Sequence, residues 1–150
     1  MSKRNFRLVL GAVAGMLAGG LAVPAVQAAD DPIVQRKAIM KDVGAAAKIA
    51  GGMLKGDVAF DADKAKLIGA TWHSAAMAFG HYFPAGSDQG DTTAMPKVWE
   101  TMDDFNGKLA SFATDAAAIG AAEGEDGVKA AIGKAFENCK GCHEAYRKPQ

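Results

Sequence analysis

The stretch Cys139-Lys140-Gly141-Cys142-His143, close to the C-terminus, determines how the rest of this chain is interpreted. It has the C-x-x-C-H spacing of a site for covalent attachment of a c-type haem. In such a site two thiols form thioethers with the porphyrin, and the adjacent imidazole binds the iron as an axial ligand. On a helix, Cys139 and His143 lie one turn apart with Cys142 beside them, so one face carries all three. We therefore expect one covalently attached haem c per chain.

Other interpretations of this spacing fit the sequence less well. A thioredoxin-like redox pair follows a strand, and no strand pattern precedes Cys139. A zinc site would need more ligands, and the other two histidines, His73 and His81, are too far apart for a one-turn ligand pair. We expect both to face solvent. A purely structural helical bundle with a coincidental motif is a third reading, which a colourless purified protein would support.

The N-terminus has the features of a secretory signal peptide. A positively charged start precedes an apolar run at residues 8–23, and Val26-Gln27-Ala28 places small residues at the −3 and −1 positions. The apolar run has 16 residues, fewer than the ~20 that a membrane-spanning helix needs. We expect residues 1–28 to be removed, which would place the mature segment, residues 29–150, in the periplasm without a membrane anchor.

The mature segment has the size of one domain and a slightly acidic balance. The full chain has 17 basic and 17 acidic residues, and loss of the three basic residues of the leader leaves 14 against 17. The sequence has no basic patch of the kind that binds nucleic acid. It also has no constellation of nucleophile and general base, so we do not expect an enzyme.

Apolar residues at helical spacing predict four helices. The first begins after Asp31-Pro32, which provide a capping carboxylate and an N-terminal proline, and runs from Ile33 to Lys55. Its expected core stripe consists of Ile33, Arg36, Met40, Val43, Ala47, Ala50 and Leu54. Arg36 is a charge within this stripe, and a buried charge needs a partner.

The second helix is expected to begin at Asp61 or Asp63 and to end before Pro84. A short link separates it from the first helix, so the two should be antiparallel neighbours. Its expected core stripe is Ala65, Ile68, Trp72, Ala75, Phe79 and Tyr82.

The third helix follows a polar, glycine-containing loop at residues 85–95. Thr92 or Thr93 is expected to cap it, with Pro96 in its first turn. Its stripe has the most regular apolar spacing in the chain and consists of Val98, Met102, Phe105, Leu109, Phe112, Ala116 and Ile119.

The fourth helix follows the turn at residues 123–127 and carries the haem motif on its core side. Its stripe is Val128, Ile132, Ala135, Cys139, Cys142, His143 and Tyr146. Four such helices with mostly short links predict an all-α, antiparallel four-helix bundle. Five aromatic side chains are expected to point mainly inward and could wall a cofactor: Trp72, Phe79, Phe105, Phe112 and Phe136.

With a C-x-x-C-H motif near the C-terminus of an exported helical chain, the sequence resembles the class II c-type cytochromes. These are cytochrome c′ and its low-spin relatives of the cytochrome c-556 type, whereas class I cytochromes have the motif near the N-terminus. The resemblance covers the mature chain. The segments that carry it are Gln35-Arg36-Lys37-Ala38-Ile39-Met40-Lys41, Leu54-Lys55-Gly56 with Phe60-Asp61, Phe83-Pro84-Ala85-Gly86-Ser87, Pro96-Lys97-Val98-Trp99-Glu100, and residues 139–147.

The resemblance implies roles for individual residues. Cys139 and Cys142 correspond to the thioether pair, and His143 corresponds to the proximal iron ligand. Arg36 resembles the arginine near the haem edge, so its expected partner is a haem propionate. Met40 aligns with the distal position, where a methionine is unbound in some cytochromes c′ and binds iron in the c-556 type. Met102 lacks this support.

The resemblance also implies a function. With Met40 off the iron, which we favour, the haem is five-coordinate and can bind small gases such as NO or CO, or carry electrons to small redox proteins. With Met40 bound, the protein is a six-coordinate, low-spin electron carrier. A haem peroxidase would need a distal His with Arg, and His73 and His81 lie off the expected core stripe. A homodimer that packs through the first two helices is expected.

Overall fold

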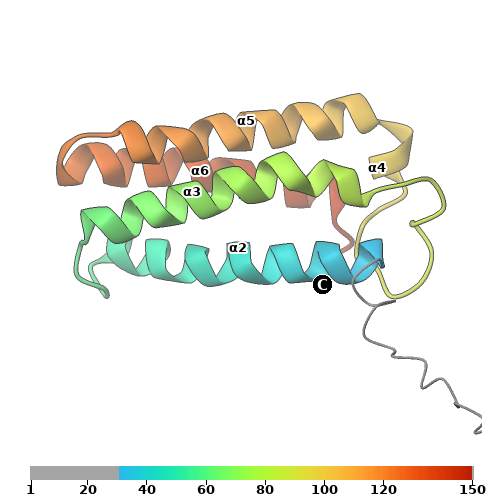
Figure 1. The fold of residues 1–150 in the computed structure, drawn as a ribbon, viewed down its shortest axis with the longest axis horizontal. Helices are drawn as coiled ribbons and strands as arrows, with labels where there is room; N and C mark the ends of the chain where they lie inside the picture. The colour runs from blue at the N-terminus through green and yellow to red at the C-terminus, as the bar shows by residue number, and fades with distance from the viewer. Residues whose placement is uncertain (1–30, 150) are drawn as a thin grey trace, which may run out of the picture.

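The computed structural model describes residues 31–149, and the expected signal peptide, residues 1–28, lies outside them. Four long helices form an up-and-down antiparallel bundle (Figure 1). They are α2 (Pro32–Lys55), α3 (Ala62–Phe79), α5 (Met102–Ala121) and α6 (Gly124–Tyr146). The expected all-α four-helix bundle is confirmed. In the described part of the chain, none of the helices combines the length and apolarity needed to cross a membrane.

The ends of α2 lie where the sequence predicts them. The carboxylate of Asp31 accepts hydrogen bonds from the backbone N–H of Ile33 at 2.7 Å and of Val34 at 3.4 Å, which satisfies two free donors of the first turn. Gly56 ends the helix in the left-handed conformation, with φ of 81°, which a residue without a Cβ adopts at little cost.

The core stripe of α2 differs from the prediction toward the end of the helix. Val43 and Ala50 are buried as expected, but Leu54 is 37% exposed and Met53 is only 1% exposed. Likewise, Ala46 is buried, whereas Ala47, which was expected in the core stripe, is only half-buried. The reason is that α2 packs mainly against α3 and much less against α6, so the column of residues beside the expected one faces the core.

The helix after the long loop is interrupted, although a single helix was predicted. A one-turn helix, α4 (Lys97–Glu100), precedes α5, and Thr101 between them has φ of −131° and ψ of 50°, outside the helical region. Pro96 immediately precedes α4. The predicted threonine cap is wrong, because the hydroxyl of Thr92 accepts from the backbone N–H of Ala94 at 3.1 Å, within the loop.

The second helix ends as expected, in a short 3-10 turn, η1 (Gly80–Tyr82), just before Pro84. Asp61 begins α3, because its carboxylate accepts from the backbone N–H of Lys64 at 2.9 Å. The prediction that His73 faces solvent is wrong. Its side chain is half-buried, with Nδ1 at 3.0 Å from the carbonyl oxygen of Ala113 on α5.

The core has two parts along the bundle. The larger part surrounds Trp72, and a second part gathers aromatic side chains near the long loop: Phe79, Phe83, Phe105 and Tyr146, with Val98 and Leu109. Met40 and Ile39 pack against both parts. Met40 and Ile39 therefore lie where the two parts of the core meet.

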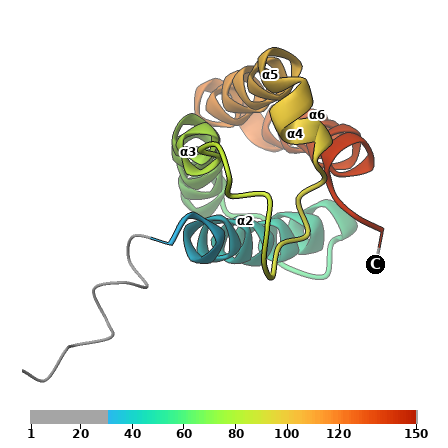
Figure 2. The same ribbon diagram turned by 90° about the vertical axis from the view of Figure 1, so that its right-hand side faces the viewer.

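The long loop crosses the end of the bundle between α2 and the end of α6 (Figure 2). Its last residues pair with the segment after α6. The backbone N–H of Met95 donates to the carbonyl of Tyr146 at 2.8 Å, and that of Lys148 donates to the carbonyl of Thr93 at 2.8 Å. Ala94 and Arg147 form an antiparallel bridge. The loop is thereby fixed beside the C-terminal end of the motif helix.

Candidate haem-binding site

A cavity opens between α2, α5 and α6 at the end of the bundle that carries the long loop. The empty space between its side chains, including the part open to solvent, is about 940 Å³. Its wall includes every residue that the sequence places in the candidate site: Arg36, Met40, Cys139, Cys142 and His143.

The two cysteines lie on the cavity side of α6 and are half-buried. Cys139 packs against the larger part of the core and Cys142 against the aromatic part. Burial raises the pKa of both thiols, so the sulfurs are protonated at neutral pH. Because the two cysteines lie three residues apart on one helix, their sulfurs form two attachment points on the same wall.

His143 is placed one turn after Cys139 and also lines the cavity. The side chain is exposed on one side, but partial desolvation against the cavity wall lowers its pKa, and the positive charge of Arg147 lowers it further. The imidazole is therefore neutral at neutral pH, and the neutral form is the one with a free nitrogen lone pair that can bind a metal.

Arg36 is buried, with 5% of its surface exposed, and its guanidinium reaches the long loop. Its Nη2 donates to the carbonyl of Ser87 at 2.8 Å, and its Nη1 lies at 3.2 Å from both the hydroxyl of Ser87 and the carbonyl of Tyr82. The guanidinium carbon also lies 4.6 Å from the ring centre of Phe83, a cation–π contact. Sequence reasoning missed this role of Ser87.

Part of Arg36 has no partner in the protein. Its Nε is buried and makes no hydrogen bond, which is costly for a charged group. Burial lowers the pKa of Arg36, and Asp31 opposes this effect, but a guanidinium stays charged at any physiological pH. Arg36 thus provides a positive charge and one unused donor at the cavity wall.

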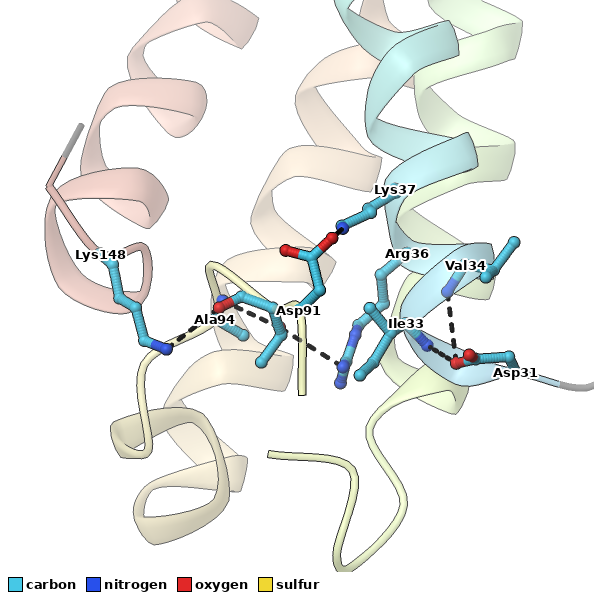
Figure 3. Close-up of polar contacts among 9 residues, drawn as sticks. Asp31, Ile33, Val34, Arg36, Lys37, Asp91, Ala94 and Lys148 are labelled. Atoms are coloured by element: carbon cyan, nitrogen blue, oxygen red, sulfur yellow. Dashed lines mark hydrogen bonds and ion pairs between the residues drawn. The ribbon is translucent and has the colours of Figure 1, made fainter. Parts of the chain in front are cut away.

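Polar side chains lie beside Arg36 (Figure 3), and those of Lys37 and Asp91 are exposed to solvent. Lys37 forms an ion pair with Asp91 of the loop, which lowers the pKa of Asp91 through the hydrogen bond. The ammonium of Lys148 donates to the carbonyl of Thr92 at 3.0 Å, and the hydroxyl of Thr92 lies 3.5 Å from Nη2 of Arg36. The loop therefore connects α2 to the segment that follows the haem motif.

Some of the remaining candidate residues line the cavity, and others do not. Met40 lines the cavity, whereas Met102 packs against the aromatic part of the core and is not part of the cavity wall. Neither His73 nor His81 lines the cavity, so a distal acid–base pair of histidine and arginine is not assembled there. Of the five aromatic residues expected to wall a cofactor, three do so: Phe79, Phe105 and Phe112.

The residues present fit a covalently bound haem. The wall offers two thiols and an imidazole on one helix, a largely apolar lining, and a buried cationic donor without a partner at the edge. A site made of protein ligands alone fits less well, because residues 31–149 contain no group of three or more His, Cys, Asp and Glu side chains arranged to hold a metal ion.

Tyr146 is a further wall residue that the helix pattern predicted only as core. Its hydroxyl hydrogen-bonds the carboxylate of Asp104 and lies 3.0 Å from the hydroxyl of Thr101. Burial and the bond to Asp104 raise its pKa, so the phenol is neutral. The periodicity of α6 cannot reveal these partners, because they lie more than 40 residues earlier in the chain.

Comparisons with known proteins identify relatives of this chain. The family model described as Cytochrome C′ matches residues 31–147. The cytochrome c′ of Rhodopseudomonas palustris is 40% identical over 147 residues, which cover 94% of this chain and 97% of that protein. The cytochrome c-556 of Agrobacterium fabrum is 38% identical over 136 residues, which cover 89% and 92%.

The solved structure of Rhodopseudomonas palustris cytochrome c′ has the same fold, with a TM-score of 0.77 at 38% identity over 80% of this chain and 98% of that chain. The proteins of this family bind a c-type haem and are not enzymes. The family match over most of the sequence, the shared bundle and the thiols and imidazole at one cavity together show that this chain belongs to the cytochrome c′ family.

Proposed function

We propose that this protein carries one haem c, attached through thioethers to Cys139 and Cys142, with His143 as the axial iron ligand. The supporting observation is that these three side chains line one wall of a single apolar cavity. When bound, the haem supplies an iron that changes oxidation state and accepts small ligands. The polypeptide contributes a neutral imidazole at His143 and a low-polarity enclosure.

The attachment is tested by mass spectrometry of protein produced in a host that attaches haem. The intact chain should carry the mass of one haem after denaturation, and Cys139→Ala should prevent normal covalent attachment. Normal covalent holoprotein from this variant would refute the assignment of the motif. A colourless wild-type protein would refute the haem assignment altogether.

We also propose that the second axial side of the iron is open to small gases such as NO and CO. The side chains that α2 and α5 contribute to the cavity include Met40, Val43, Leu109 and Phe112, and these are apolar apart from the soft thioether of Met40. The same helices also contribute the charged residues Arg36, Lys37 and Lys108. The apolar part of the wall leaves room for an uncharged diatomic ligand and offers it no competing hydrogen bonds. Arg36 contributes a positive charge toward the propionates.

The second candidate function is that of a six-coordinate electron carrier with Met40 bound to iron. Two observations favour it: Met40 lines the cavity, and one relative at 38% identity is a cytochrome c-556. Met40→Leu separates the two functions, because leucine keeps the volume and loses the sulfur. An unchanged spectrum supports the open site, whereas conversion from low-spin to high-spin shows that Met40 is a ligand.

We propose that the protein acts in the periplasm, where it exchanges electrons with small redox proteins. The support is the leader at residues 1–28, which has the composition of a cleaved signal peptide. N-terminal sequencing of the mature protein is the test. A start at residue 29 agrees with export and cleavage, and a start at Met1 or Ser2 contradicts them.

We propose a homodimer that packs through α2 and α3. The outer face of α3 exposes two large apolar side chains, Leu67 at 67% and Met77 at 62%, and α2 exposes Val34 and Ile49. Sedimentation velocity of the wild type and of Leu67→Glu tests this. A dimer that dissociates in the variant supports the proposal, and a wild-type monomer at micromolar concentration refutes it.

A further inference from the structure

Trp72 makes an unusual contact between two helices of the bundle. It lies on α3, its side chain has no exposed surface, and its indole N–H donates to the backbone carbonyl of Val43 on α2 at 3.2 Å. Val43 is inside α2, where each carbonyl also accepts the N–H of the residue four positions later. The indole therefore uses the second lone pair of a helix carbonyl and connects α3 to the middle of α2.

The indole ring is itself held by two other helices. Its centre lies 6.0 Å from that of Phe112 on α5 and 5.4 Å from that of Phe136 on α6. Phe112 lines the cavity, and Phe136 is three residues before Cys139 on the motif helix. Trp72 thus contacts α2 and also α5 and α6, two other helices that contribute to the cavity wall.

The carbonyl that accepts this bond belongs to a wall residue. Val43 lines the cavity, and Met40 lines it one turn earlier on α2. The rest of the α2 core beyond Val43 consists of Ala46, Ala50 and Met53, and α2 packs only lightly on α6. Few large side chains of α2 therefore fix its distance from α6. The indole hydrogen bond, which is directional, helps to fix the position of α2.

We propose that Trp72 is a positioning residue that fixes the α2 wall, through Val43, and thereby sets how easily a small ligand reaches the cavity beside Met40. The proposal rests on the proposed haem site. Trp72 does not line the cavity, so it acts only through the placement of α2. Loss of the bond loosens the wall.

The test compares Trp72→Phe with Trp99→Phe in haem-loaded protein. Trp99 serves as the control, because its indole N–H also donates to a backbone carbonyl, that of Pro84 at 3.0 Å, but in the long loop, at a more exposed position, and not in α2. The readouts are the CO association rate after flash photolysis and the width of the C–O stretching band. If the two indoles only stabilise the fold, the two variants should not differ in the CO association rate or in the width of the C–O band.

In Trp72→Phe we expect CO association to become faster by about fivefold, the factor that corresponds to the net worth of one hydrogen bond, with a broadened C–O band. Trp99→Phe should stay within twofold of the wild type. Equal behaviour of the two variants overturns the proposal.

Wild-type protein provides a second readout if Trp72→Phe does not fold. Coupling between two sites is reciprocal, so CO binding should change the hydrogen-exchange rate of the Trp72 indole and leave that of Trp99 unchanged. Equal responses overturn the proposal. If the wild-type iron ignores CO, the open-site function fails on its own, and the positioning role then predicts that Trp72→Phe, but not Trp99→Phe, acquires CO binding.

Discussion

Replacement of Arg36 by methionine should loosen the long loop and destabilise the protein. The change removes the donors to Ser87 and Tyr82 and leaves the buried carbonyl of Ser87 without a partner. An unsatisfied buried acceptor costs about 1–3 kcal/mol. Loss of the second acceptor and of the contact with Phe83 adds to this cost, and removal of a poorly solvated charge offsets part of it. We expect a net loss of about 2–4 kcal/mol.

The assay is urea unfolding of haem-loaded protein, followed by far-UV circular dichroism, together with limited proteolysis. With a slope of about 2 kcal/mol per M of urea, in the middle of the typical range, the midpoint should fall by about 1–2 M, and cleavage within residues 83–95 should accelerate. Lys37→Met is the control, because it removes only the exposed ion pair with Asp91, and such pairs contribute little. Equal midpoints for both variants would refute this account of Arg36.

A third variant separates the loop contacts from the expected haem propionate. Arg36→Lys keeps the positive charge but cannot reach Ser87 and Tyr82 together, because an ammonium lacks the planar fork of a guanidinium. We therefore expect Arg36→Lys to lose most of the unfolding free energy that Arg36 contributes, while its reduction potential changes less than that of Arg36→Met. An Arg36→Lys protein with wild-type stability and a strongly shifted potential would show that Arg36 serves the haem and not the loop.

The other predictions concern stability. Gly69→Ala should destabilise the bundle by about 1–3 kcal/mol in urea unfolding, because a Cβ there would lie 2.8 Å from the backbone oxygen of Ala116; a midpoint equal to the wild type would show that the helices separate without cost. Asp61→Asn should matter mainly above the ordinary aspartate pKa of about 3.9. The backbone N–H of Lys64 lowers the pKa of Asp61 in the folded state, so its contribution is complete above that pH and disappears as the pH falls through the lowered value. The melting temperatures of Asp61→Asn and wild type should converge in acid, and a constant gap between pH 7 and pH 2 would contradict this. Ile132→Ala should cost about 2–5 kcal/mol, because the side chain is fully buried; a loss below 1 kcal/mol in the same assay would mean that the core around it repacks.

Features encoded by neighbouring residues were predictable from the sequence. Asp31 and Gly56 act through local hydrogen bonds and a local backbone conformation, so the bounds of α2 follow from residue type alone. The motif residues also lie within one turn of each other, which is why a single spacing rule places Cys139 and His143 on one wall.

Features that depend on distant partners were not predictable. The apolar spacing continues from Val98 to Met102 across Thr101, so it does not reveal the interruption between α4 and α5. At this interruption the hydroxyl of Thr101 contacts that of Tyr146, a residue from the end of the chain. Likewise, Arg36 is 51 residues from Ser87, in a polar loop without periodicity. Helical spacing identifies a buried face, but the choice between Leu54 and Met53 was decided by the unequal packing of α2 on its neighbours.

The most direct test of the open haem site is the absorption spectrum of the mature, haem-loaded protein, oxidised and reduced, before and after addition of CO. The proposed open site, with Met40 off the iron and an apolar cavity that admits the gas, predicts a high-spin spectrum that changes on CO addition. A sharp low-spin alpha band that does not respond to CO would contradict it and would identify the protein as a six-coordinate electron carrier.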